Sequence, residues 1–184
     1  MNHSTHFSVW RARGTQTTRA GKYSLWKKQG NKEELDFDFD EMKRTAEAAI
    51  GTFTKEQLFV FLTVMDAVKS CKPLCIFLSA RGGCGKTYLL NAILAAIRSL
   101  EPGGCVALAM ATTGIAANLL KLGRTLHSRM KAPLDPDESS TLKISAQSPL
   151  AELIRMSKLF LIDEATMLDR YNLEAMDRSL RDLL

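Results

Sequence analysis

The sequence predicts an α/β fold in which helices cover a parallel β-sheet. Three short apolar runs, at residues 74–78, 105–110 and 158–162, have the composition of buried strands. Helical segments separate the three runs, a glycine-rich turn follows the first, and two acids follow the third. Strands that alternate with helices in this way are typical of a doubly wound parallel sheet.

Length and composition indicate one globular domain. The chain has 184 residues, which is enough for one ordinary α/β domain and too few for two. Hydrophobic residues make up 46% of it, and no apolar run approaches the roughly 20 residues of a membrane span. The four cysteines (Cys71, Cys75, Cys84 and Cys105) lack the spacing of a zinc site and the density of a disulfide scaffold. We expect a reducing compartment, no membrane partner and no zinc.

The N-terminal segment, residues 1–41, is basic and then acidic. Residues 1–32 contain seven Lys or Arg and no acid, whereas acids dominate residues 33–41. Three interpretations of the basic part stay open: a disordered arm that contacts nucleic acid, a mitochondrial transit peptide, or the end of a larger upstream region. The acidic part could be an edge strand, another extended segment packed on the domain, or a solvated linker. We place the folded domain at residues 42–184.

A helix is expected from Met42 to Gly51, and a second one begins after Thr54. Thr54 has the position of an N-cap, and Gln57 stands three residues later, where a capping-box partner belongs. A glutamine shortly before a phosphate-binding loop can also bind both edges of adenine, because its amide donates and accepts at once. The spacing does not distinguish the two roles of Gln57.

The segment from Ala80 to Thr87 has the pattern of a phosphate-binding loop between a strand and a helix. Backbone N–H groups would converge on the phosphates, Lys86 would reach the β- and γ-phosphates, and the Thr87 hydroxyl would hold Mg²⁺. The expected nucleotide-binding residues of the loop are Gly82, Gly83, Cys84, Gly85, Lys86 and Thr87. Ala80 stands where the pattern has its first glycine, and a positive φ there would cost alanine about 1–2 kcal/mol.

Asp163 and Glu164 indicate the reaction. They follow four apolar residues, which puts them at the carboxyl edge of the sheet, where open α/β sheets bind ligands. Asp163 would hold Mg²⁺, and Glu164 would polarise the attacking water, so that Lys86, Asp163 and Glu164 form the expected catalytic set. Two acids at this position favour hydrolysis over transfer to a second small substrate.

The remaining elements are expected as follows. A helix spans residues 115–121, a helix–turn segment spans 122–128, and a long surface loop or lid covers 132–149. A short helix at 149–156 leads into the third strand, and an amphipathic helix spans 168–184.

Four segments carry a resemblance to the Pif1-like DNA helicases of superfamily 1, including those of Helitron transposons. They are residues 53–57, 80–87, 111–117 with 123–128, and 163–167, in the order of that family. The third is the most specific, because Thr-Gly-Ile-Ala-Ala followed by Arg-Thr-x-His-Ser is no general NTPase feature. Ala80 departs from the family pattern, and so does Thr166, which stands where the family commonly has proline.

The resemblance implies a RecA-like P-loop NTPase domain that uses ATP and Mg²⁺. Gln57 then reads adenine, and a strip of residues contacts the backbone of single-stranded DNA. The strip residues are Thr113, Gly114, Thr125, His127 and Ser128. The family function is ATP-dependent 5′-to-3′ DNA unwinding in repair, recombination and telomere maintenance. We expect a nuclear protein, or a mitochondrial one as the alternative, and a monomer.

We also expect the chain to be an N-terminal fragment that covers most of the first RecA-like domain and does not unwind DNA alone. Two other classes stay open. The first is a different P-loop enzyme, such as an AAA+-type ATPase or a nucleotide kinase. The second is a non-catalytic relic or binding module that retains the motifs by ancestry.

Overall fold

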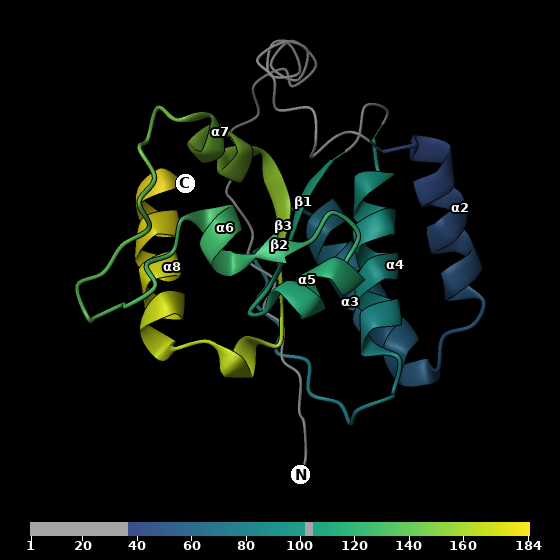
Figure 1. The fold of residues 1–184 in the computed structure, drawn as a ribbon. Helices are drawn as coiled ribbons and strands as arrows, with labels where there is room; N and C mark the ends of the chain where they lie inside the picture. The colour runs from purple at the N-terminus through teal and green to yellow at the C-terminus, as the bar shows by residue number, and fades with distance from the viewer. Residues whose placement is uncertain (1–36, 102–104) are drawn as a thin grey trace.

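The computed structural model describes residues 37–101 and 105–184, in which helices flank a central sheet (Figure 1). The helices on the amino-terminal side are α2 (Phe39–Ile50), α3 (Lys55–Lys69) and α4 (Lys86–Arg98). They are followed by β1 (Val106–Ala111), α5 (Gly114–Leu119), β2 (Arg124–Thr125), α6 (Leu126–Met130), α7 (Pro149–Met156), β3 (Ser157–Asp163), η2 (Ala165–Met167) and α8 (Arg170–Leu183). The basic segment of residues 1–32 lies outside the described residues. None of the described helices is long and apolar enough to cross a bilayer.

The sheet has three parallel strands in the order β2-β1-β3. In the central strand, Ala111 pairs with Thr125 of β2 on one side and with Asp163 of β3 on the other. The carboxyl ends of all three strands therefore meet at one edge. This arrangement confirms the predicted α/β fold with a parallel sheet and flanking helices.

The two faces of the sheet are covered by different helices, as Figure 1 shows. Neighbouring residues of a strand point to opposite faces, and both faces of β1 and β3 are buried. Ala107, Ala109, Leu159 and Leu161 pack in the cluster that contains α2, α3 and α4. Val106, Leu108, Met110, Phe160 and Ile162 pack in the cluster that contains α6, α7 and α8. Both-sided burial explains why these strands are continuously apolar.

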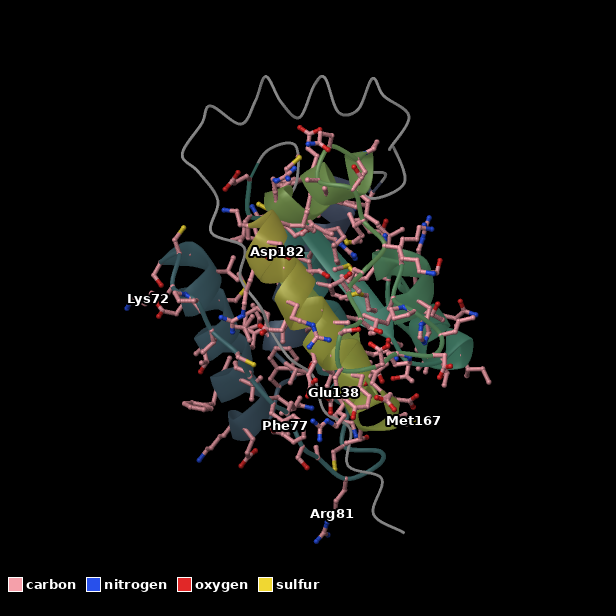
Figure 2. The ribbon with its side chains drawn as sticks, turned by 90° about the vertical axis from the view of Figure 1, so that its left-hand side faces the viewer. Lys72, Phe77, Arg81, Glu138, Met167 and Asp182 are labelled. Atoms are coloured by element: carbon pink, nitrogen blue, oxygen red, sulfur yellow. The ribbon has the colours of Figure 1, made fainter. Side chains whose placement is uncertain are left out.

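The prediction of a buried strand at residues 74–78 is wrong. This segment does not join the three-stranded sheet. Ile76 and Leu78 are half-buried against the α2–α4 cluster, whereas Cys75 is exposed and Phe77 is 62% exposed. Figure 2 shows Phe77 and, beyond it, Arg81 at the lower end of the molecule. Apolar composition brought one side of the segment to the core, but membership of the sheet also depends on which segments lie side by side in the folded chain.

The acidic segment ends in a helix. The Asp38 carboxylate accepts hydrogen bonds from the N–H groups of Asp40 and Glu41 at 2.9 and 3.1 Å, and α2 begins at Phe39. Phe37 is half-buried between the two core clusters. Residues 37–41 are therefore part of the packed domain, and residues 33–36 lie outside the described part of the chain.

Residues 124–125 differ from the predicted helix–turn segment. Arg124 and Thr125 pair with the end of β1 as a short strand, and α6 starts directly afterwards. Between α6 and α7 no helix or strand forms, in agreement with the predicted loop over 132–149.

Candidate active site

Two glycines of the phosphate-binding loop, Gly83 and Gly85, occupy positions that require glycine. Gly83 and Gly85 have φ of 77° and 73°, a region that side chains with a Cβ rarely adopt. A Cβ on Gly85 would also lie 2.9 Å from Nε2 of Gln57. Gly85 is the N-cap of α4, so the loop ends where the N–H groups of a 13-residue helix are unpaired. This is the backbone arrangement of an anion site.

Ala80 fits its position without strain. The non-glycine residues of positive φ in the described part of the chain are Cys71, Leu122, Lys131 and Glu164. The penalty expected for alanine at this position is therefore absent. The Ala80 carbonyl accepts a hydrogen bond of 3.0 Å from Nζ of Lys86, which holds the ammonium group over the loop.

A pocket of about 370 Å³ gathers the predicted catalytic residues. Lys86 and Thr87, from the start of α4, lie in its wall together with Asp163 and Glu164, from the end of β3. Gly83 and Gly85 contribute to the same wall, whereas Gly82, Cys84 and Gln57 do not. Residues about 80 positions apart in the sequence thus face one cavity, because parallel strands end at the same sheet edge.

Asp163 has the environment of a cation ligand. Only 5% of the residue is exposed. Burial raises the pKa of its carboxyl group, while the hydrogen bond from the Glu164 N–H (2.9 Å) and the charge of Lys86 act in the opposite direction. A divalent cation would offset the unfavourable desolvation of this carboxylate, and the Thr87 hydroxyl in the same pocket is a second oxygen ligand. The two residues therefore fit a Mg²⁺ ion.

Glu164 has an unusual backbone conformation. Its φ and ψ are 54° and 36°, in the left-handed region. The Thr112 hydroxyl donates a hydrogen bond of 2.8 Å to the Glu164 carbonyl oxygen, and the Thr113 hydroxyl lies 3.4 Å from Oε2. Non-glycine residues in this region are concentrated at functional sites, where the surrounding structure enforces them.

Gln57 makes the capping box with Thr54, as one of the two sequence interpretations expects. Its Oε1 accepts from the Thr54 N–H at 3.0 Å, and the Thr54 hydroxyl accepts from the Gln57 N–H at 3.3 Å. The Gln57 amide also donates a hydrogen bond of 3.1 Å to the Cys84 carbonyl. The side chain thus joins α3 to the phosphate-binding loop.

The residues of the predicted DNA strip lie at the same sheet edge. The hydroxyls of Thr113 and Thr125 cap α5 and α6, accepting from Ala116 N at 3.2 Å and Ser128 N at 3.3 Å. Figure 1 shows α5 and α6 on either side of β2. Gly114 and Ser128 are exposed and His127 is half-buried, with Nδ1 3.3 Å from the Ala132 carbonyl oxygen. Thr113 is the member of this strip that hydrogen-bonds to pocket residues in the described part of the chain, namely Glu164 and Ala116.

Two features of the site have no clear signal in the sequence. Tyr88 lies in the pocket wall, and its hydroxyl is 2.8 Å from that of Thr52. Its ring meets Phe53 edge-on, with 6.0 Å between the ring centroids. Thr112 supports Glu164 from a position 52 residues away. Tyr88 could have been suspected from its place after Thr87, but Thr112 becomes recognisable only when β1 and β3 are paired.

Comparison with known proteins agrees with this geometry. A search of curated proteins gives no match. The family model of the PIF1-like helicases matches residues 52–184, which include the phosphate-binding loop, the DNA strip and the two acids. With most of the chain matched, this protein belongs to the PIF1-like helicase family.

Proposed function

We propose that the chain binds single-stranded DNA and binds and hydrolyses ATP with Mg²⁺. This hydrolysis would drive 5′-to-3′ DNA unwinding. The observation that carries the proposal is the single pocket in which Lys86, Thr87, Asp163 and Glu164 meet. Family membership favours this function over an AAA+-type ATPase or a nucleotide kinase.

Each residue has a distinct role in the proposed reaction. The loop N–H groups and the start of α4 hold the phosphates, and Lys86 exchanges the Ala80 carbonyl for the β- and γ-phosphate oxygens. Thr87 and Asp163 would hold Mg²⁺, and the bound ion would supply positive charge beside the phosphates. Glu164 orients the attacking water and accepts its proton.

A test of nucleotide binding compares Lys86→Ala with Lys72→Ala. Both variants lose one positive charge, but Lys72 is exposed and in Figure 2 lies well apart from Arg81, a residue of the pocket wall. A hydrogen bond to a charged group contributes about 1.5–3 kcal/mol, so Lys86→Ala should weaken Mg-ATP binding roughly 10- to 100-fold. Lys72→Ala should bind like the wild type. Equal affinities of all three proteins in calorimetry would contradict the assignment of the loop.

A test of DNA binding uses the double variant His127→Ala, Ser128→Ala. Hydroxyl and backbone donors neutralise few phosphates, so we expect weak binding that is independent of base sequence and lost at moderate salt. The double variant should bind a labelled oligonucleotide more weakly in fluorescence anisotropy. Removal of residues 1–32 should lower only the part of the DNA affinity that is the same for single strands and duplex. If that removal abolishes all binding and the double variant changes nothing, the strip is not a DNA contact.

Hydrolysis needs a separate measurement. Phosphate release with and without oligonucleotide should show turnover that DNA stimulates and that Glu164→Gln removes. Binding of Mg-ATP without any turnover would support the alternative of a non-catalytic nucleotide-binding module.

A further inference from the structure

Glu164 is held by two consecutive threonines at the end of β1. Thr112 bonds its carbonyl oxygen at 2.8 Å, and Thr113 contacts its carboxylate at 3.4 Å. The Glu164 N–H is itself bonded to Asp163. The backbone of Glu164 is therefore fixed on both sides, whereas its carboxylate contacts Thr113, among the described residues, only at 3.4 Å.

The Thr113 hydroxyl already has a second partner. Its oxygen accepts from the Ala116 N–H at the start of α5 and so caps that helix. A hydroxyl has one proton to donate, and in the structure this proton is directed to Glu164. The distance of 3.4 Å is well beyond the usual 2.5–3.0 Å of such bonds, so another acceptor can readily replace Glu164.

Thr113 lies next to the pocket residue Glu164, at the N-cap of α5. It is half-buried, and the next two residues, Gly114 and Ile115, are exposed, Ile115 at 82%. An oxyanion bound beside these exposed residues can accept the hydrogen bond that the Thr113 hydroxyl donates. The phosphate of a single strand bound along the strip, as in the proposed function, is such an oxyanion.

We propose that Thr113 is a positioning residue that gives its one hydrogen-bond donor either to Glu164 or to a DNA phosphate. Without DNA, Thr113 restrains the Glu164 carboxylate. With DNA, the hydroxyl turns to the phosphate and the carboxylate is released to accept a hydrogen bond from water. Thr112 keeps the backbone of Glu164 in place in both states. This exchange links DNA binding to hydrolysis and rests on the proposed function.

The exchange predicts that Thr113 and Glu164 are coupled in DNA binding, which a double-mutant cycle measures without any turnover. Glu164→Ala removes the competing acceptor, so it should raise the affinity for a labelled single-stranded oligonucleotide. Part of that rise is electrostatic, because an acid is lost. In the Thr113→Val background only the electrostatic part should remain. The rise in affinity should then be smaller by about twofold, the low end for one hydrogen bond, because the Thr113–Glu164 contact is long.

Two controls separate the exchange from a loss of structure. Thr125→Val removes the equivalent cap of α6 and a proposed DNA contact. The Thr125 hydroxyl, however, bonds to the Ser128 N–H rather than to Glu164. In the Thr125→Val variant, Glu164→Ala should therefore raise the DNA affinity by the same factor as in the wild type. Thr113→Ser retains the hydroxyl and should restore the coupling. If Thr113→Val does not fold, the cycle is measured with Thr113→Gly, because glycine is accepted at an N-cap and removes the hydroxyl without adding a charge.

A hydrolysis assay adds a second readout. Thr113→Val should reduce the stimulation of kcat by DNA and leave the KM for ATP unchanged, and Thr113→Ser should recover the stimulation. A role in structure alone would change both constants.

The outcomes distinguish the exchange from the proposed function. The exchange is overturned if Glu164→Ala changes the DNA affinity equally in the wild type and in the Thr113→Val variant. It is also overturned if the wild type binds no single-stranded DNA. If the double-mutant cycle shows coupling between Thr113 and Glu164 but the protein does not bind Mg-ATP, the exchange is supported and the proposed ATPase activity is contradicted.

Discussion

A side chain at Gly123 should destabilise the protein, although Gly123 has no functional group and is not one of the predicted site residues. A Cβ at this position would lie 2.2 Å from the Ala117 carbonyl oxygen and 2.8 Å from Cβ of Leu120. Contact between a carbon and a carbonyl oxygen needs at least about 3.3 Å, so the two segments must separate by roughly 1 Å. The obstacle is backbone, and the same oxygen accepts the Leu120 N–H at 3.1 Å. The variant Gly123→Ala must therefore displace the end of α5.

The expected cost follows from overpacking in other proteins, about 1–3 kcal/mol. For a chain of this size, each kcal/mol lowers the melting temperature by about 2–4 °C, so Gly123→Ala should melt about 2–12 °C lower. Because Ala116 and Leu119 of α5 form part of the nucleotide pocket, Mg-ATP affinity should fall as well. Thermal unfolding followed by circular dichroism, together with calorimetry, measures both effects.

Gly114→Ala is the matched control. A Cβ on Gly114 meets nothing within 4 Å, and its φ is not positive. Position 114 is the first residue of α5. Alanine there should leave the free energy of unfolding unchanged or raise it by up to about 1 kcal/mol. If Gly123→Ala melts with the wild type, or if the two variants lose the same stability, the steric argument is refuted.

Three further substitutions test other parts of the structure. Ala80→Gly should give no gain in nucleotide affinity and lose up to about 1 kcal/mol of stability in urea unfolding, because no φ penalty exists to be relieved; a clear gain would contradict this. Arg98 is 1% exposed, burial lowers its pKa to about 10, and it donates to the carbonyls of Lys121 and Ala107 at 2.9 Å each. Arg98→Met should cost about 1–3 kcal/mol. Arg98→Lys should cost more, because it keeps the buried charge but cannot span both carbonyls; the reverse order would refute this reading. Asp163→Asn should raise the unfolding free energy at pH 7. Burial raises the pKa of Asp163, so its ionised form opposes folding above that pKa. The advantage should disappear as the pH falls below the ordinary carboxyl pKa of about 4, where Asp163 is protonated in both states; an advantage that is the same at both pH values would exclude this cause.

The sequence by itself determined the features that depend on neighbouring residues. The continuous apolar runs of β1 and β3 predicted strands buried on both faces. The spacing of Thr54 and Gln57 predicted a capping box, and the glycine pattern predicted a phosphate-binding loop before a helix. Such features require only the local backbone preference of a few adjacent residues, which composition and spacing encode.

The tertiary structure alone decided what depends on distant partners. Residues 74–78 have the composition of a strand, but their place outside the sheet depends on which segment lies beside them. Likewise, Gln57 faces Cys84 across 27 residues, and Thr112 faces Glu164 across 52. Hydrogen bonds between residues so far apart in the sequence are set by strand pairing and helix packing. No local pattern records them, and for that reason the restraint on Glu164 became visible only in the folded chain.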